Sequence, residues 1–377
     1  MSLKRKETNS NNHTIHLMIS FPKLVILMLL PIALGSCKKD DNPYKNAKYD
    51  FSAVDQFVDE NLGVYQNKVA ILVSQNGQII YHKEVNMGLN TPLPIASASK
   101  WLSGAVIMAL ADEQKLSLND TVGKFLPDFS KYKKGHITIR QLFSHTSGFA
   151  GDGDGSDTTD KYEYRNDLTL ARAVDSIAAY TPLVATPGAI FSYGSASMQV
   201  AGRIAEVVSG KPWGQLFNEK IAQPCQMRAE YFLRAQNPLI AGGVRTTARD
   251  YLNFLEMIAA GGSYGGRQVL SRSALSDMLK DQTNGATIVG TPYPNNPFSP
   301  YNNKDLRYGV GNWLDVVDPA GNVLESSSPG LLGAHPWQDS KNQVAGIVFT
   351  RTAPRISQAT SLKIRQMIRD IMASTGK

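Results

Sequence analysis

Apolar and polar residues follow different periods in different parts of this chain. An uninterrupted apolar run spans 24–34. Residues 52–62 show the three- to four-residue spacing of an amphipathic helix. Residues 68–85 contain two runs rich in β-branched residues around Asn76-Gly77, a pair that favours tight turns. The pattern therefore predicts a helix followed by a β-hairpin at the start of the globular part.

Helical spacing dominates from 97 to 280, and strand-like runs return only towards the C-terminus. Strands are predicted at 308–316, 322–334 and 343–350, followed by a last helix over 358–373. Strands at both ends with helices between them indicate an α+β fold, because a βαβ series would alternate the two.

Two segments show neither period. In residues 150–160, Asp152 and Asp154 have the spacing of an EF-hand calcium loop, but the required glycine is misplaced and no glutamate closes the loop. A flexible acidic loop at the rim of a site is the favoured interpretation. Residues 286–307 are rich in Pro, Asn, Tyr and Phe, and predict a long irregular loop that either shapes a substrate-binding wall or is disordered.

The first 50 residues have the features of an exported lipoprotein. The apolar run is too short for an ordinary membrane span and fits a signal peptide over 1–36. Leu-Gly-Ser-Cys at 34–37 resembles a bacterial lipobox, which predicts lipidation of Cys37; a plain signal peptide is the alternative. Residues 37–50 then form a polar tether, and 51–377 form the globular domain. We expect a protein anchored by lipid to a membrane of the bacterial cell envelope.

Composition narrows the range of functions. A chain of 377 residues, 42% of them hydrophobic, can bury a large core. The formal charge of +7 comes partly from the first 37 residues, and no basic block is interleaved with aromatic residues, so nucleic-acid binding is not expected. Cysteine and histidine do not occur at metal-ligand spacing, and no cofactor is expected. If Cys37 is lipidated, Cys225 is a buried free thiol.

The strongest chemical signal is Ser97-Ala98-Ser99-Lys100, which precedes an apolar helical stripe. Ser97 and Lys100 stand at i and i+3 and so share one face of a helix. A serine hydroxyl needs a neighbouring base to act as a nucleophile. Burial disfavours the charged form of lysine, so a buried lysine can be neutral and can serve as that base. The N-terminus of a helix also favours developing negative charge. The alternative is that Ser97 only caps the helix.

A second copy of the motif, Ser130-Lys131-Tyr132-Lys133, lies in a charged run without an apolar helix behind it. About one Ser-x-x-Lys is expected by chance in a chain of this length. We interpret this copy as a surface loop.

Five motifs occur in one order along the chain, and together they resemble the serine β-lactamase-like superfamily. The nearest branch holds class C β-lactamases, D-alanyl-D-alanine carboxypeptidases and related carboxylesterases. The resemblance covers roughly 51–375 and implies an antiparallel sheet flanked by terminal helices, with an inserted helical region and the active site between the two. The motifs that carry it are Ser97–Lys100, Leu142–Gly148, Tyr193–Ser195, Gly242–Asp250 and Tyr308–Gly311.

The resemblance implies roles for individual residues. Ser97 would be the acylated nucleophile and Lys100 its base partner. Tyr193 would relay protons to Ser97 and to the leaving group, unless it is only a half-buried aromatic residue that caps a helix. The oxyanion would be held by the N–H of Ser97 and by a second backbone N–H on the edge strand after the superfamily's third catalytic motif, which is a further motif beyond the five above.

This third catalytic motif is usually Lys-Thr-Gly or His-x-Gly in the superfamily, and the present chain departs from both. The best match is Ser328-Pro329-Gly330, which assigns the second oxyanion N–H to Leu331. In β-lactamases and carboxypeptidases the motif's lysine helps to hold a substrate carboxylate, a role that serine lacks the charge to fill. His335 is an alternative cation, although an ordinary polar surface histidine is the favoured interpretation.

A second departure is Ser195, where the β-lactamases have an asparagine that binds the substrate's acylamide group. A serine is shorter and lacks the paired donor and acceptor of an amide. Both departures favour a serine hydrolase of the esterase or peptidase type, acting through an acyl-enzyme on a small-molecule ester, amide or peptide. The alternatives are a β-lactamase or D-alanyl-D-alanine carboxypeptidase, and a non-catalytic binding or sensor protein of the same fold.

Two other motifs are expected to be structural. Gly261–Gly265 matches a nucleophile elbow around Ser263, but it follows a helix instead of a strand. His145, in the second motif, suggests a Ser-His-Asp triad, yet catalysis in the superfamily needs no histidine.

Overall fold

The computed structural model describes residues 48–153, 161–232, 236–292 and 306–374. The predicted signal peptide, Cys37 and Asp154 lie outside these ranges. Within them, no helix combines the length and the apolar character that a membrane span requires.

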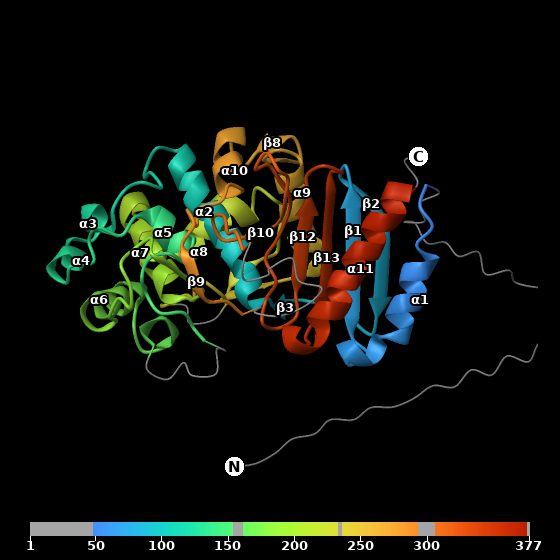
Figure 1. The fold of residues 1–377 in the computed structure, drawn as a ribbon, viewed down its shortest axis with the longest axis horizontal. Coiled ribbons are helices and arrows are strands. Elements are labelled where there is room, and N and C mark those ends of the chain that lie inside the picture. The colour runs from blue at the N-terminus through green and yellow to red at the C-terminus, as the bar shows by residue number, and fades with distance from the viewer. Residues whose placement is uncertain (1–47, 154–160, 233–235, 293–305, 375–377) are drawn as a thin grey trace, which may run out of the picture. The chain divides into compact units, whose positions relative to one another are not determined.

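A six-stranded antiparallel sheet forms one side of the domain (Figure 1). Its order is β10-β11-β12-β13-β1-β2, so the N-terminal hairpin pairs with the last strand of the chain. The two ends of the domain therefore close one sheet, and the segment between them is an insertion. The strands are β1 (Val69–Gln75), β2 (Gln78–Val85), β10 (Trp313–Val317), β11 (Val323–Ser327), β12 (His335–Asp339) and β13 (Val344–Thr350).

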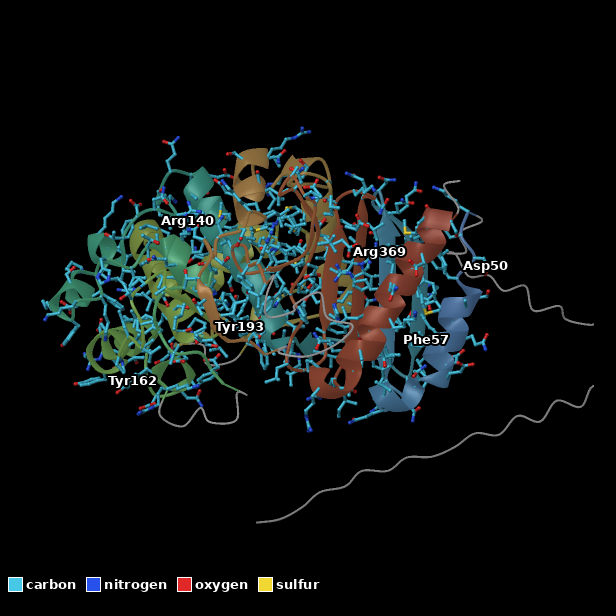
Figure 2. The ribbon with its side chains drawn as sticks, in the orientation of Figure 1. Asp50, Phe57, Arg140, Tyr162, Tyr193 and Arg369 are labelled. Carbon is cyan, nitrogen blue, oxygen red and sulfur yellow. The ribbon has the colours of Figure 1, made fainter. Side chains whose placement is uncertain are left out.

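Both faces of the sheet are covered, and for this reason the first five residues of β1, Val-Ala-Ile-Leu-Val, are all apolar. Ile71 packs in a cluster with α1 (Ser52–Glu60) and α11 (Pro354–Ser374). Leu72 points to the other face, into the core shared with the inserted helices. α1 and α11 lie side by side over the first face (Figure 1; Figure 2 adds the side chains). Successive residues of β1 thus bury apolar area on opposite faces.

The inserted region lies beside the sheet, with α9 packed against its second face (Figure 1). Its helices are α2 (Ser99–Asp112), α3 (Val122–Phe125), α4 (Pro127–Lys131), α5 (Ile139–Phe143), α6 (Leu170–Tyr180), α7 (Ala196–Ser209), α8 (Trp213–Phe217), α9 (Ala248–Ala259) and α10 (Arg272–Met278). Short 3₁₀ turns are η1 (Leu62–Tyr65), η2 (Ala96–Ala98) and η3 (Tyr162–Tyr164), and η4 (Asn218–Ala222) is a π-helical turn. The short strands are β3 (Leu93–Pro94), β4 (Ile190–Ser192), β5 (Glu230–Tyr231), β6 (Val244–Thr246), β7 (Ser263–Tyr264), β8 (Arg267–Gln268) and β9 (Thr287–Gly290).

The predicted α+β class, the antiparallel sheet with helices at its two ends and the helical insertion are confirmed. The hairpin turn also lies where expected: Asn76 and Gly77 have φ of 51° and 75°, the left-handed values that a tight hairpin turn needs.

Four predictions about elements were wrong. The strand expected over 308–316 begins only at Trp313. The strand expected over 322–334 ends at Ser327, and β12 follows it unpredicted, because His-Pro-Trp-Gln-Asp shows no alternation of apolar and polar residues. α11 begins at Pro354, ahead of the expected 358. Within the expected irregular loop, residues 287–290 form β9, which pairs in parallel with β4; residues 293–305 lie outside the described ranges.

Candidate active site

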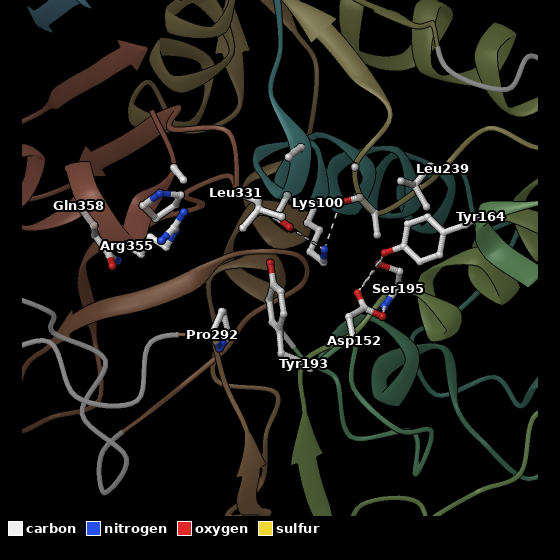
Figure 3. A pocket seen from close by; sticks show the side chains of 17 residues that line it. Lys100, Asp152, Tyr164, Tyr193, Ser195, Leu239, Pro292, Leu331, Arg355 and Gln358 are labelled. Carbon is white, nitrogen blue, oxygen red and sulfur yellow. Dashed lines mark hydrogen bonds between the residues drawn. The ribbon is translucent and has the colours of Figure 1, made fainter. Parts of the chain in front are cut away.

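Ser97 lies in the turn η2, directly before α2. The chain enters this turn from β3, which pairs with β6, and the N–H of Ile95 donates to the carbonyl of Val244 at 3.0 Å. Ala96 has φ of 46°, a left-handed value that non-glycine residues adopt rarely and at some cost. This strained, anchored turn presents Ser97 to a cavity of about 640 Å³ (Figure 3).

Lys100 is the buried partner of Ser97. Its Nζ donates to Ser97 Oγ at 3.1 Å and to the carbonyl oxygen of Ala241 at 3.1 Å, and the side chain is 1% exposed. Burial lowers the pKa of Lys100 to about 8, against an opposing effect of the Asp152 charge. The spacing read from the sequence therefore places an amine that can exist in its neutral form in direct contact with the hydroxyl.

Two glycines let distant backbone segments close around this turn. A Cβ on Gly311, whose φ is 84°, would clash with the carbonyl oxygen of Lys100. A Cβ on Gly330 would clash with the carbonyl oxygen of Ile95. The close contact at Gly311 explains why the motif Tyr308–Gly311 needs a glycine there. Gly330 lets the motif Ser328-Pro329-Gly330 lie directly against the turn that holds Ser97.

The third catalytic motif, Ser328–Gly330, lies in the turn between β11 and β12. The second oxyanion N–H was expected on an edge strand after the motif, and this was wrong: Leu331 lies in the turn, and the strand that follows, β12, has β11 on one side and β13 on the other. The N–H of Gly330 donates to Ala334 at 2.8 Å, and the N–H of Gly333 donates to Gly330 at 2.9 Å. For Leu331, no backbone N–H hydrogen bond is found in the described part of the chain, and its side chain lines the cavity.

Ser328 and His335 are both buried. Ser328 Oγ donates to the carbonyl oxygens of Ser97 at 3.3 Å and of Gly311 at 3.5 Å, so its hydroxyl is engaged with the backbone that supports the nucleophile. His335 is 3% exposed, so its interpretation as a surface histidine was wrong. Burial, together with the charge of Arg365, lowers the pKa of His335 to about 3, which leaves it neutral and unable to replace the missing lysine.

Tyr193 is held on three sides. Its N–H donates to Gly290 of β9 at 2.9 Å, and its ring stacks on Trp313 with centroids 5.2 Å apart. The ring of His145 lies 4.4 Å away. Lys100 Nζ lies 4.6 Å from the Tyr193 ring centroid, so the tyrosine and the lysine meet within the cavity (Figure 3).

His145 is a packing residue behind Tyr193, as expected. Its Nδ1 accepts a hydrogen bond from the N–H of Gly194 at 3.3 Å. Burial and the nearby Lys100 charge hold the pKa of His145 well below its usual range, so the imidazole is neutral.

The wall around Ser195 contains two residues that the sequence did not identify. Ser195 donates to Asp152 through both its N–H, at 3.1 Å, and its hydroxyl, at 2.6 Å. The hydroxyl of Tyr164 lies 3.2 Å from Ser195 Oγ and 3.4 Å from Asp152 Oδ2. Asp152 was considered only as a calcium ligand or as part of a rim loop, and Tyr164 carries no pattern that marks it.

The first turn of α11 forms the opposite wall (Figure 3). It contributes the exposed Arg355 and the buried Gln358. The helix was predicted to begin at 358, which is too late, and the prediction therefore missed Arg355. The cavity has a cation in its lining where the sequence offered only His335 as an alternative to the missing lysine.

The residues dismissed as decoys lie away from the cavity lining. Ser130 is exposed at the end of α4, a helix end where a loop was expected. Ser263 lies in the β7–β8 hairpin and donates to Gln268 Oε1 at 2.7 Å. Cys225 is a buried free thiol, as expected, and burial raises its pKa to about 12. Across the described ranges, no three or more His, Cys, Asp or Glu side chains are grouped so that they could hold a metal ion.

Comparison with known proteins agrees with this geometry. Protein flp of Staphylococcus aureus (strain MW2) is 31% identical over 176 residues, which are 43% of this chain and 34% of flp; the match thus spans about a third of that relative. A crystal structure from Bacteroides dorei DSM 17855, provisionally assigned as a β-lactamase, matches with a TM-score of 0.72 and 31% identity, over 84% of this chain and 99% of that one. A family VIII carboxylesterase shares the fold with a TM-score of 0.65 and 18% identity, over 85% of this chain and 98% of its own.

The match extends to the family level. A sequence model described as Beta-lactamase covers residues 54–366, which include the five ordered motifs and Ser328-Pro329-Gly330. The protein therefore belongs to the Beta-lactamase family.

Proposed function

We propose that this protein is a serine hydrolase that cleaves an ester or amide through an acyl-enzyme on Ser97. The observation that carries the proposal is the 3.1 Å hydrogen bond between Lys100 Nζ and Ser97 Oγ within a cavity of about 640 Å³. With a pKa near 8, roughly a tenth of Lys100 is neutral at pH 7, which suffices for a base that acts at each turnover. Membership of the Beta-lactamase family and the shared fold with a carboxylesterase support the hydrolase class.

In the proposed mechanism, Ser97 Oγ attacks the substrate carbonyl carbon while neutral Lys100 takes the hydroxyl proton. The N–H groups of Ser97 and Leu331 hold the oxyanion. The bond to the leaving alcohol or amine then breaks, and the phenol of Tyr193 supplies its proton, which Lys100 replaces. A water molecule attacks the acyl-enzyme through the same groups and releases the acid and free Ser97.

Intact-protein mass spectrometry after treatment with a fluorophosphonate, and separately with penicillin, tests the proposal. We expect a stable phosphonyl adduct that maps to Ser97. If a folded protein takes up neither reagent, the proposal fails and the non-catalytic alternative of a binding or sensor protein gains support.

Activated short esters are expected to be better substrates than β-lactams. An ester such as p-nitrophenyl butyrate needs only the nucleophile, the relay and the oxyanion donors. A β-lactam also brings a carboxylate, which meets the carboxylate of Asp152 in the same cavity, while the available cation, Arg355, is exposed and screened by water. We expect kcat/KM for the ester to exceed that for nitrocefin by about tenfold or more. A higher value for nitrocefin would favour the β-lactamase or D-alanyl-D-alanine carboxypeptidase alternative.

The activity is expected to rise with pH through the pKa of Lys100. Only neutral Lys100 can accept the Ser97 proton, so kcat/KM should increase about tenfold per pH unit below pH 8 and level off above it. The rate of Ser97 phosphonylation, measured by mass spectrometry from pH 6 to 9.5, follows the fraction of neutral Lys100. This measurement avoids the spontaneous hydrolysis of ester substrates at high pH. A rate that stays flat over this range would exclude Lys100 as the base.

We also propose that the mature protein is a lipoprotein attached through Cys37. Cys37→Ala should abolish incorporation of a clickable fatty acid and release the protein from membranes or block its processing, because Cys37 would be the attachment point. An unlabelled wild-type protein that begins at another residue would support the plain signal peptide instead.

A further inference from the structure

The two ends of the cavity carry opposite charges. Asp152, Tyr164 and Ser195 lie on one side of the Ser97–Lys100 pair, and Arg355 lies on the other (Figure 3). A substrate that spans the cavity thus meets a carboxylate, Asp152, on one side of the reacting bond. The mechanism proposed above gives this carboxylate no role.

Asp152 is fixed in place but retains free accepting capacity. It accepts hydrogen bonds from the N–H and the hydroxyl of Ser195, at 3.1 and 2.6 Å, and from the Tyr164 hydroxyl at 3.4 Å. A carboxylate can accept about four hydrogen bonds. The side chain is 16% exposed and lines the cavity, so its remaining lone pair is open to a ligand.

Among the residues that the structure describes, only a loose ion pair compensates the charge of Asp152. Lys161 Nζ lies 3.9 Å from Oδ1, beyond hydrogen-bond distance, and donates instead to the backbone carbonyl of Asp152 at 3.3 Å. Lys100 is near enough for the Asp152 charge to raise its pKa, but its own hydrogen bonds go to Ser97 and Ala241. A cationic ligand group could therefore approach the carboxylate without displacing a tight ion pair.

We propose that Asp152 binds a cationic amino group of the substrate, so that the enzyme prefers amides or esters built from an amino acid or an amino alcohol. This inference rests on the proposed hydrolase function and names its substrate class. The ammonium donates to the open lone pair of the carboxylate, and Leu239 and the Tyr164 ring form the walls along the connecting carbons.

A purely structural role for Asp152 makes a different prediction. Ser195 directly precedes α7, and a side chain that accepts its N–H stabilises the start of that helix. Asparagine keeps an accepting oxygen at the same position but removes the charge. Asp152→Asn therefore separates a role in capping from a role in binding a cation.

The test compares substrates that differ only in NH₃⁺ against CH₃, or NH⁺(CH₃)₂ against CH(CH₃)₂. One arm places the charge on the acyl part: glycyl, β-alanyl and 6-aminohexanoyl p-nitroanilides against propanoyl, butanoyl and heptanoyl p-nitroanilides. The other arm places it on the leaving group: S-2-(dimethylamino)ethyl thiobutyrate against S-3-methylbutyl thiobutyrate. In at least one arm we expect kcat/KM to favour the cationic member by on the order of tenfold, the size of one partly exposed charge-assisted hydrogen bond.

Variants of the full chain assign that preference. Asp152→Asn should reduce the ratio to about one. It also removes the charge that raises the pKa of Lys100, so a change in rate should be shared by the cationic and neutral members of a pair and cancel in the ratio. Lys161→Gln should increase the ratio by removing a competing cation. Asp128→Asn, an exposed acid in a surface ion pair with Lys131, is the matched control and should leave the ratio unchanged. A ratio near one in both arms of the wild type, or a ratio that survives Asp152→Asn, would overturn the inference.

Two further measurements separate this inference from the proposed function. A bound ammonium should cancel the effect of Asp152 on Lys100, so the kcat profile should lie at lower pH for the cationic substrate than for its neutral partner, a shift absent in Asp152→Asn. If no substrate is cleaved and Ser97 takes up no fluorophosphonate, the proposed function fails. In that case calorimetry with the Ser97→Ala variant compares the affinities for 6-aminohexanamide and heptanamide, and so tests cation binding without catalysis. Equal affinities for the two amides would reject the proposed cation-binding site.

Discussion

Replacing Ser97 with alanine should abolish turnover of every substrate that the wild-type protein cleaves. The hydroxyl is the group that would form the acyl-enzyme, and removing the nucleophile of a serine hydrolase costs on the order of 10⁶-fold in kcat. Ser97 is half-buried and its Oγ accepts from Lys100, so alanine removes one hydrogen bond without opening a core cavity. The variant should therefore fold normally, which circular dichroism and thermal melting would verify.

Ser130→Ala and Ser263→Ala are the matched controls. Both serines occur in motifs that resemble a catalytic one, but Ser130 is exposed at the end of α4 and Ser263 bonds to Gln268 in a hairpin. Each variant should keep activity close to that of the wild type. Residual turnover by Ser97→Ala within tenfold of the wild-type rate would contradict the acyl-enzyme mechanism.

The elements that the sequence predicted well are those whose pattern is local. The hairpin over 68–85 combines β-branched runs with an Asn-Gly turn, and both signals depend on neighbouring residues. The contact between Ser97 and Lys100 follows from helical spacing alone. By contrast, β12 is held by pairing with β11 and β13, and Gly346 opposite Trp337 provides room for the indole ring. Tertiary contacts of this kind leave no period in the sequence.

The residues of the cavity walls could not be predicted from the sequence for the same reason. Asp152 and Tyr164 belong to the insertion and Arg355 to the C-terminal helix, and they line one cavity only because the insertion folds back on the sheet. None of them belongs to a motif with a mechanism of its own, so a reading by motif passes over them. Resemblance to a family pointed to the groups that we propose carry out the chemistry, while the residues that we propose select the substrate depend on how this chain closes the fold.

Some residues of the ordered motifs have a packing role and do not line the cavity. Tyr308-Gly309-Val310-Gly311 contributes no group to the cavity lining, yet a Cβ on Gly311 would clash with Lys100 and a Cβ on Gly104 would clash with Val310. These glycines let α2 pack directly against the backbone that leads into β10. The motif therefore supports the catalytic helix through steric fit.

The sheet carries a buried charge cluster that links its far edge to α11. Arg365 pairs with Asp315 of β10 at 2.5 Å and with Glu325 of β11, and the three side chains are 4%, 0% and 7% exposed. Burial raises the pKa of Asp315, and the Arg365 charge opposes that effect. α11 also supplies Arg355 to the cavity, so the cluster fixes the helix whose first turn forms one wall of the site.

Arg365→Met should destabilise the protein by about 3–5 kcal/mol, because it leaves the buried carboxylate of Asp315 without its cation and leaves Glu325 with only the partly exposed Arg369. The deficit should be smaller at pH 5 than at pH 8: without Arg365 the pKa of Asp315 rises further, the folded state binds more protons than the unfolded state, and stability falls as pH rises. Urea titrations of both proteins at the two pH values measure this. Arg369→Met removes the cluster's exposed arginine, 41% accessible, which also pairs with Glu325 at 2.6 Å, and should cost less than about 1 kcal/mol. Equal losses in the two variants, or a deficit independent of pH, would show that the cluster does not hold α11 through its buried charges.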